Sequence, residues 1–265
     1  MDYTLKSEKD IAAMRKAGLV VWNAHQAAAE FIKPGVSTAE INAAIEQCIL
    51  DQQASALFKG VPGKVPFPAS SCISVNEQIV HGIPGERRLC EGDIVSVDIG
   101  AKLNDWCGDA ARTYAVGNIS TRAQQLLEVT EGALRLAIEQ IPKCRMWSQV
   151  ARKMQEYVEK AGFVVIEGLV GHGIGKNMWE PPQVPNYYTR QFQINQDFML
   201  QPGLVIAIEP MVSYERSDFR QLSDHWTLVT SDGAPSAHFE HTIALTRKGP
   251  QILTAGPNGK TWGVD

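Results

Sequence analysis

The 265-residue sequence is 44% hydrophobic and 20% charged, with a formal net charge of −4 at pH 7. This length and composition are typical of a folded protein with a well-buried core and exclude a disordered chain. A mildly acidic chain without clustered Lys and Arg is not expected to bind nucleic acid, and no apolar run approaches the roughly 18 residues that a membrane span needs.

The N-terminal part of the chain predicts two helices followed by a loop. Ser7 can cap the first helix, with Asp10 three residues later as a variant of the capping box. Ser37 and Glu40 form a capping box for the second helix. The segment 60–68 contains two Gly and three Pro, which predicts a rigid loop.

Short strands are expected after this loop, over residues 72–75, 93–99 and 110–116. Apolar and polar residues alternate in the second of them, which is the period of a half-buried strand. A turn at 102–105 would join the last two strands. Asp98 and Asp109 are therefore expected on the two arms of one hairpin.

The second half of the chain repeats the order of helices followed by strands. One helix is expected to begin with a capping box at Thr121 and Gln124, and another to span 148–160. The strands expected after them cover residues 164–170, 205–208, 227–229 and 242–245. Helices before strands, twice, favour an α+β fold with two related halves. No linker divides them, so residues 1–265 are predicted to form a single domain.

Carboxylates occur within or beside apolar, strand-like sequence at four positions: Asp98, Asp109, Glu209 and Glu240. Burying an unpaired charge costs several kcal/mol or more. For any one of them, pairing with Lys or Arg, or exposure on an edge strand, is the simpler interpretation. Few basic residues lie nearby in sequence, so the four together favour a shared cation.

His172 lies among glycines directly after an apolar strand, where a single histidine is more often a turn residue than a ligand. The segment 171–175 is not a dinucleotide-binding loop, because that motif would need glycine at the position of Lys176. With the carboxylates, His172 would complete an oxygen-rich donor set that suits Mn, Fe(II), Co or Zn. Carboxylates can bridge two such ions, so we expect two divalent metal ions.

Short motifs in the same order as in a known family extend over nearly the whole chain: Ser74–Glu77, His81–Pro84, Gly92–Asp98, Gly108–Asp109, Gly171–Gly175, Ile208–Met211, Asp224–Trp226 and Glu240–Thr242. Together they resemble the type I methionine aminopeptidases. The resemblance implies the pita-bread fold, in which two pseudo-symmetric α/β halves surround a curved antiparallel sheet. It also implies removal of the N-terminal methionine from nascent proteins or peptides, with water activated at the metal pair attacking the scissile amide.

The resemblance assigns roles to individual residues. The metal ligands would be Asp98, Asp109, His172, Glu209 and Glu240. His81 and Glu209 would be catalytic, with His81 forming a hydrogen bond near the scissile amide and Glu209 transferring protons. Phe67, Cys72 and Trp226 would line the pocket for the methionine side chain. From the residues alone, His81 is equally consistent with a turn histidine.

Two features depart from the family pattern. Trp179 stands where a second substrate-contacting histidine is usual, and an indole can donate one hydrogen bond but cannot carry a proton. Loss of an oxyanion donor at that position would cost roughly 10²–10³ in rate. The loop 61–66 is longer than usual and replaces residues of the methionine pocket. Two alternatives therefore stay open: a specialised paralogue with low activity or another substrate, and a non-catalytic binder.

The expected partner is the N-terminus of a peptide or nascent chain, with association with the ribosome as a further expectation. A monomer in the cytoplasm is expected. The five cysteines are widely spaced without a CxxC pair, which favours reduced thiols. Residues 1–10 carry charges and no apolar stretch, so no secretory signal is expected there.

Overall fold

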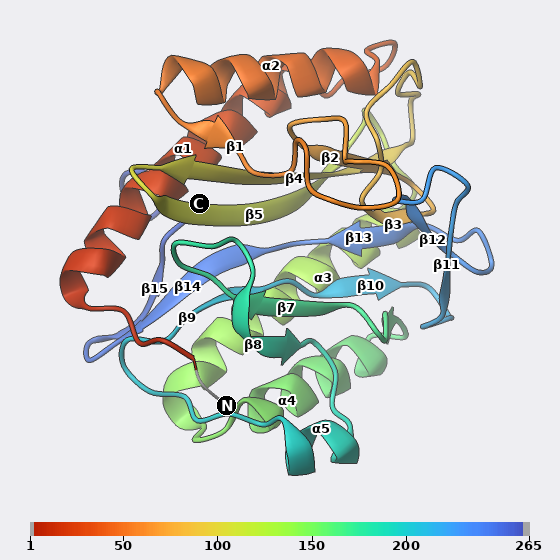
Figure 1. The fold of residues 1–265 in the computed structure, drawn as a ribbon. Coiled ribbons are helices and arrows are strands. Elements are labelled where there is room, and N and C mark those ends of the chain that lie inside the picture. Colours follow the sequence, from red (N-terminus) through yellow and green to blue (C-terminus); the bar gives the residue numbers. More distant parts are fainter. Residues whose placement is uncertain (1–2, 262–265) are drawn as a thin grey trace.

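The first half of the molecule places two helices over an antiparallel hairpin. The structure is a computed structural model that describes residues 3–261; the ends of the predicted 1–265 domain, residues 1–2 and 262–265, lie outside the described residues. The elements of this half are α1 (Glu8–Phe31), α2 (Thr38–Asp51), β1 (Ser55–Ala56), β2 (Cys72–Val75), β3 (Gln78–Val80), β4 (Ile94–Leu103) and β5 (Trp106–Ala115). Figure 1 shows α1 and α2 lying along β4 and β5.

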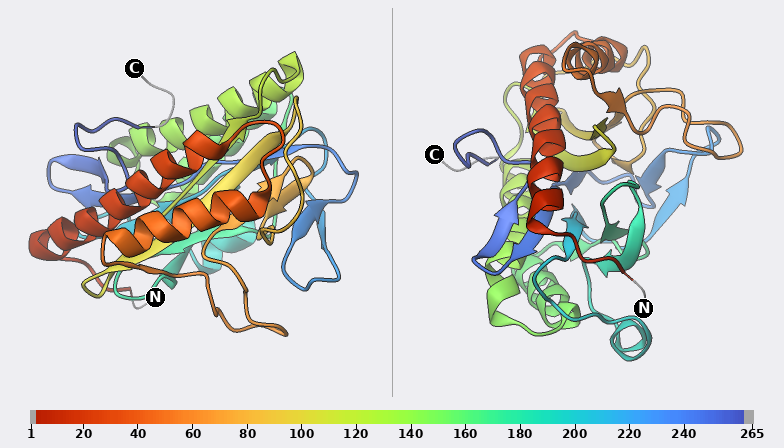
Figure 2. Two further views of the ribbon diagram at one scale, coloured as in Figure 1. Left: turned by 90° about the horizontal axis from the view of Figure 1, so that it is seen from above. Right: turned by 60° about the vertical axis from the view of Figure 1, so that its left-hand side comes forward.

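The second half places another pair of helices against a second set of antiparallel strands. Its helices are α3 (Thr121–Gln140), a 3₁₀ turn (Ile141–Lys143), α4 (Trp147–Lys160) and α5 (Arg190–Asn195). Its strands are β6 (Val164–Val165), β7 (Val170–Gly173), β8 (Glu180–Pro185), β9 (Val205–Ile208), β10 (Met211–Ser213), β11 (Phe219–Gln221), β12 (Leu228–Thr230), β13 (Ser236–His238), β14 (His241–Thr246) and β15 (Gly249–Ile252). In the right-hand view of Figure 2, α1 stands upright, with the blue C-terminal strands to its left and the teal strands to its right.

Helix starts follow the local sequence, with one correction. The predicted capping boxes at Ser7 and Ser37 are both present. The predicted box at Thr121 is wrong, because α3 begins with Ser120 as its N-cap. The Ser120 hydroxyl accepts a hydrogen bond from the backbone N–H of Ala123, three residues along the chain. Two adjacent hydroxyl residues compete for one capping position here, and the first of them takes it.

The predicted β4–β5 hairpin is confirmed. All pairs between these strands are antiparallel, and Asn104 and Asp105 form the turn with φ of 48° and 69°. Asp98 pairs with Ala111, and Gly100 pairs with Asp109. Because directly opposed residues share a face of a sheet, the side chains of Asp98 and Asp109 point to the same side.

One predicted strand is divided in the structure. Residues 164–170 were expected to be continuous, but β6 and β7 are separate, and they belong to different sheets. Gly168 lies between them with φ of +88°, a backbone conformation that breaks an extended strand. Strand β7 instead joins a five-stranded sheet in the order β15-β14-β9-β7-β8. This pairing places the segment after Val170 beside β9.

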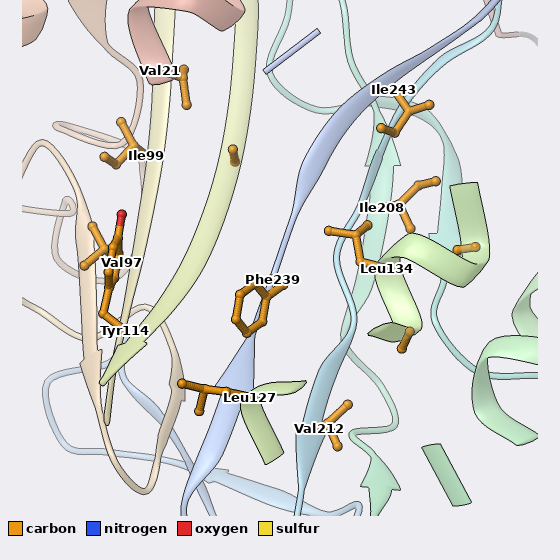
Figure 3. Close-up of a cluster of buried hydrophobic side chains, with 14 of the residues drawn as sticks. Val21, Val97, Ile99, Tyr114, Leu127, Leu134, Ile208, Val212, Phe239 and Ile243 are labelled. Carbon is orange, nitrogen blue, oxygen red and sulfur yellow. The ribbon is translucent and has the colours of Figure 1, made fainter. Parts of the chain in front are cut away.

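A buried apolar core connects the two halves. In Figure 3, Phe239 lies between Val97 and Tyr114 of the β4–β5 hairpin on one side and Ile208 on the other. All four are buried. Packing both sheets on one ring fixes their relative position, which sets the distance across the space between them. No helix among the described residues is both long and apolar enough to cross a bilayer.

Candidate metal centre

The candidate site lies where β5 of the first half meets the C-terminal strands. Thr242 Oγ1 accepts a hydrogen bond from the backbone N–H of Asp109 at 3.0 Å and donates to the Asp109 carbonyl at 2.8 Å. Two residues further along β5, the Ala111 carbonyl accepts a hydrogen bond from the backbone N–H of Glu240 at 2.8 Å. These bonds hold Asp109 and Glu240 side by side, although they are far apart in the chain.

The five predicted metal ligands converge here, and we call them the ligand cluster: Asp98, Asp109, His172, Glu209 and Glu240. His172 Nε2 lies 3.7 Å from Asp109 Oδ2 and 3.8 Å from Glu209 Oε1. Ligand atoms of Asp109, His172 and Glu240 lie within 4.8 Å of one another. Such separations are too long for good hydrogen bonds and leave room for an ion between the groups.

The electrostatics of the ligand cluster are those of buried acids, with the His172 imidazole as the basic group that acts on Asp109 and Glu209. Burial raises the pKa of Asp98 and Glu240 well above the usual range, and neighbouring carboxylates raise both further. Burial likewise raises the pKa of Glu209 to about 8. Within residues 3–261, Asp98 Oδ1, Asp109 Oδ1 and Glu240 Oε1 are buried without a hydrogen-bond partner. Buried oxygens of this kind call for a cation.

The donor set fits a divalent metal. It combines carboxylate oxygens with one imidazole. This set suits Mn, Fe(II), Co or Zn in a catalytic site, whereas structural zinc is usually held by cysteine thiolates. Cys72 lies opposite Asp98 across β2 and β4. Burial, followed by the nearby carboxylates, raises the pKa of the Cys72 thiol well above its usual value. Cys72 is therefore a neutral thiol and does not add a thiolate to the site.

A cavity of about 710 Å³ surrounds the ligand cluster. All predicted site residues line it: Phe67, Cys72, His81, Asp98, Asp109, His172, Trp179, Glu209, Trp226 and Glu240. One end is apolar, since the rings of Phe67 and Trp226 meet edge to face at 5.3 Å and pack with Phe58 and Met178. The Trp226 indole N–H donates to the Val65 carbonyl at 2.7 Å, which joins the loop 61–66 to this end of the cavity.

His81 lies at the inner side of the cavity in an unusual backbone conformation. Its φ is +59°, which costs energy for a residue with a Cβ and is common at functional sites. Burial lowers the pKa of His81 to about 4, so its imidazole is neutral at pH 7. Its ring lies 6.4 Å from that of Trp226. A neutral imidazole there can donate or accept one hydrogen bond next to the apolar end.

One lining residue was missed by the sequence analysis. His238 is 2% exposed, and its Nε2 lies 3.8 Å from Glu209 Oε2 without a hydrogen-bond partner among the described residues. Burial lowers its pKa to about 3. The signal was available, because His238 stands two residues before Glu240, and alternate residues of an extended segment share a face.

The sequence of residues 12–247 matches the model of the metallopeptidase family M24. The chain belongs to this family. It is 46% identical over 249 residues to methionine aminopeptidase 1 of Bacillus subtilis, covering 94% of this chain and 98% of that protein. It is 43% identical over 250 residues to methionine aminopeptidase of Clostridium perfringens, with the same two coverages.

Solved M24 structures confirm the predicted fold. Methionine aminopeptidase of Thermotoga maritima superimposes with a TM-score of 0.89 at 38% identity, covering 96% of this chain and 99% of that one. Prolidase of Pyrococcus furiosus, at 22% identity, has a TM-score of 0.72 over 94% of this chain and 65% of its own, and supports the fold alone. The α+β pita-bread prediction, with two similar halves around curved antiparallel strands, is therefore correct.

Proposed function

We propose that this M24 metallopeptidase removes the N-terminal methionine from peptides or nascent proteins. The observation that carries the proposal is a cluster of buried acids and imidazoles directly beside an apolar pocket closed by aromatic rings. An aminopeptidase needs both parts, because one binds the first side chain and the other acts on the bond that follows it. The methionine aminopeptidases similar to this chain over nearly its full length support the same substrate.

We assign two divalent metal ions to the ligand cluster, which Asp98, Asp109, His172, Glu209 and Glu240 would hold. The ion would be Co, Mn, Fe or Zn. When bound, such ions supply Lewis-acid polarisation of a carbonyl and lower the pKa of water. The unpaired oxygens of Asp98, Asp109 and Glu240 support this assignment, since each of them has an unused acceptor site.

The protein's own groups would bind and orient the substrate. Phe67, Cys72 and Trp226 form the apolar end that suits an unbranched thioether side chain. His81, neutral at pH 7, would form a hydrogen bond with the scissile amide. Glu209 would take a proton from the attacking water and return it to the leaving amine, because its carboxylate lines the cavity beside the other ligands.

The proposed substrate bears on the partner of the enzyme. Its partner would be a free N-terminus, of a peptide or of a nascent chain. Association with the ribosome, a monomeric state and a cytoplasmic location stay predictions. The alternative of a specialised paralogue with low activity or another substrate, drawn from Trp179 and the loop 61–66, is less favoured. Proteins named methionine aminopeptidase match 94% of the chain.

The proposal is tested with purified protein loaded in turn with Mn, Fe, Co and Zn. Peptides Xaa-Ala-Ser with each of the common N-terminal residues are offered, and release of the first residue is followed. We expect methionine to be released fastest, and Glu209→Gln to reduce the rate by roughly 10²-fold or more. No release of methionine under any metal condition, or a clear preference for another first residue, would refute the proposal.

A further inference from the structure

Lys6, in the segment before α1, forms an ion pair that is hidden from solvent. Its Nζ donates to Glu180 Oε2 at 2.6 Å, and the two side chains are 7% and 16% exposed. In the other Lys or Arg ion pairs found within residues 3–261, both side chains are at least 32% exposed. Separating the partners of a buried pair leaves a buried charge without a counter-charge, which costs several kcal/mol. This pair therefore holds the two segments together more strongly than a surface ion pair would.

The ion pair ties the N-terminal segment to Glu180, the first residue of β8, directly after the loop 174–179. Glu180 Oε1 also accepts from the backbone N–H of Asn177 at 3.1 Å, so this one carboxylate closes the loop. The backbone N–H of Lys6 donates to the Gly203 carbonyl at 2.7 Å. At Gly175, an added Cβ would lie 2.5 Å from both Lys6 Cε and Glu180 Oε1, so the loop is packed directly onto the pair.

This loop carries Trp179 into the cavity. Trp179 immediately precedes Glu180, and its ring lies 6.4 Å from the His172 ring at an angle of 68°. It is 54% exposed, and its indole makes no hydrogen bond among the described residues. The position of the ring is therefore set by the backbone that bears it. The only buried charged contact next to that backbone is the Lys6–Glu180 pair, within the part of the chain that the structure describes.

The cavity has a closed end and an open side, which gives a direction to a bound peptide. Phe67 and Cys72 at the closed end are each 3% exposed. The open side is lined by exposed residues, Trp179 and Gln183 among them. If the methionine side chain fills the closed end and the scissile bond faces the ligand cluster, the second residue of the peptide leaves past Trp179.

We propose that Trp179 selects the second residue of the peptide and that the Lys6–Glu180 ion pair is the positioning contact that makes this selection sharp. The inference rests on the proposed function and adds to it a residue outside the cavity. A ring held rigidly rejects a bulky second side chain by overlap, whereas a ring on a loosened loop gives way. Lys6 acts on the substrate only through Trp179.

The test compares hydrolysis of Met-Ala-Ser with that of Met-Leu-Ser in four proteins: the unmodified enzyme, Lys6→Met, Trp179→Ala and the double variant. We expect Trp179→Ala to lower the preference for alanine over leucine about tenfold. Lys6→Met should lower it several-fold, mainly through a smaller KM for Met-Leu-Ser. In the Trp179→Ala background Lys6→Met should change nothing further, because both changes act through one ring. Lys6→Arg should restore the preference.

Lys59→Met is the matched control, because it breaks an exposed ion pair with Glu46 of the same 2.6 Å length. Hydrogen exchange of residues 175–180 gives a readout that needs no activity, and it should be faster in Lys6→Met and unchanged in Lys59→Met. Glu180→Gln, which keeps a side-chain oxygen for Asn177, replaces Lys6→Met if that variant does not fold.

Unchanged exchange in the loop, or an equal effect of Lys6→Met with and without Trp179, would overturn the positioning role. An enzyme that releases no methionine from any peptide would overturn the proposed function and the selection together. Faster exchange in that case would still assign the ion pair its hold on the loop. Release of methionine with a preference that none of the variants alters would leave the proposed function standing and overturn this inference alone.

Discussion

Thr242→Val should disturb the ligand cluster without touching a ligand. Valine has nearly the shape of threonine but lacks the hydroxyl that accepts from the Asp109 N–H and donates to its carbonyl. Thr242 is fully buried, so no water replaces the lost partner. A buried backbone group without a hydrogen bond costs about 1–3 kcal/mol, and two such groups give a loss of about 2–6 kcal/mol in the free energy of unfolding.

Chemical denaturation of the metal-free protein measures this loss, and calorimetric titration measures metal affinity. We expect affinity to fall by roughly 10–100-fold, as is usual when a residue that orients a ligand is removed. Thr246→Val is the control, since its hydroxyl donates to the Gly249 carbonyl at 2.7 Å in the β14–β15 hairpin and not to a ligand. It should cost about 1 kcal/mol and leave affinity unchanged. Equal affinities of the two variants for metal would refute the argument.

Two further predictions concern metal removal and the apolar end. Burial raises the pKa of Glu209 to about 8 in the folded state, against 4.5 in the unfolded state. The folded protein therefore holds a proton that the unfolded chain has lost. The free energy of unfolding of protein stripped of metal by a chelator should fall by about 1–2 kcal/mol between pH 6.5 and 8. Added Mn should abolish this slope in urea unfolding; a rising stability without metal would contradict it. Trp226→Leu should raise the KM for methionine peptides roughly tenfold, because it frees the loop at Val65, and unchanged steady-state kinetics would count against that role.

The histidines set the lower limit of that pH window. Burial lowers the pKa values of His25, His238 and His241 to about 3 each, and that of His81 to about 4. They are neutral in the folded state and become charged on unfolding below about pH 6.5, so they remove stability as the pH falls. Above pH 6.5 these four no longer contribute. The curve is then shaped by Glu209 and by His172, whose pKa is raised by Asp109 and Glu209 against the opposing effect of burial.

Local sequence was enough to predict the parts of the site that depend on neighbouring residues. The β4–β5 hairpin follows from alternation and a turn, and it places Asp98 and Asp109 on one face. The capping boxes at Ser7 and Ser37 follow from hydroxyl and carboxyl groups three residues apart. In each case a short-range hydrogen bond or the pleat of one strand decides the structure, and both are visible in a few consecutive residues.

The convergence of His172, Glu209 and Glu240 could not be predicted in this way. It depends on which strands pair and on how the halves pack, and no periodicity encodes either choice. The shortage of nearby basic residues and the family resemblance indicated a shared site, but neither indicated the pairing that forms it. The hold of Thr242 on Asp109 spans 133 residues of sequence, and that of Lys6 on Glu180 spans 174. Both are contacts of one side chain with a distant segment, and no pattern in the neighbouring residues predicts them.

The ligand cluster is also a constraint on the fold. A protein of this size is stable by about 5–15 kcal/mol, and each buried ionised carboxylate costs several kcal/mol. Four of them around one imidazole cannot all be ionised without a cation. Without one they take up protons instead, which is why the pKa values of Asp98, Glu209 and Glu240 are raised. Protons and metal ions therefore compete for these oxygens. On the proposed assignment, a cation lets every carboxylate keep its charge at neutral pH, so the groups that would bind metal also make the folded protein depend on it.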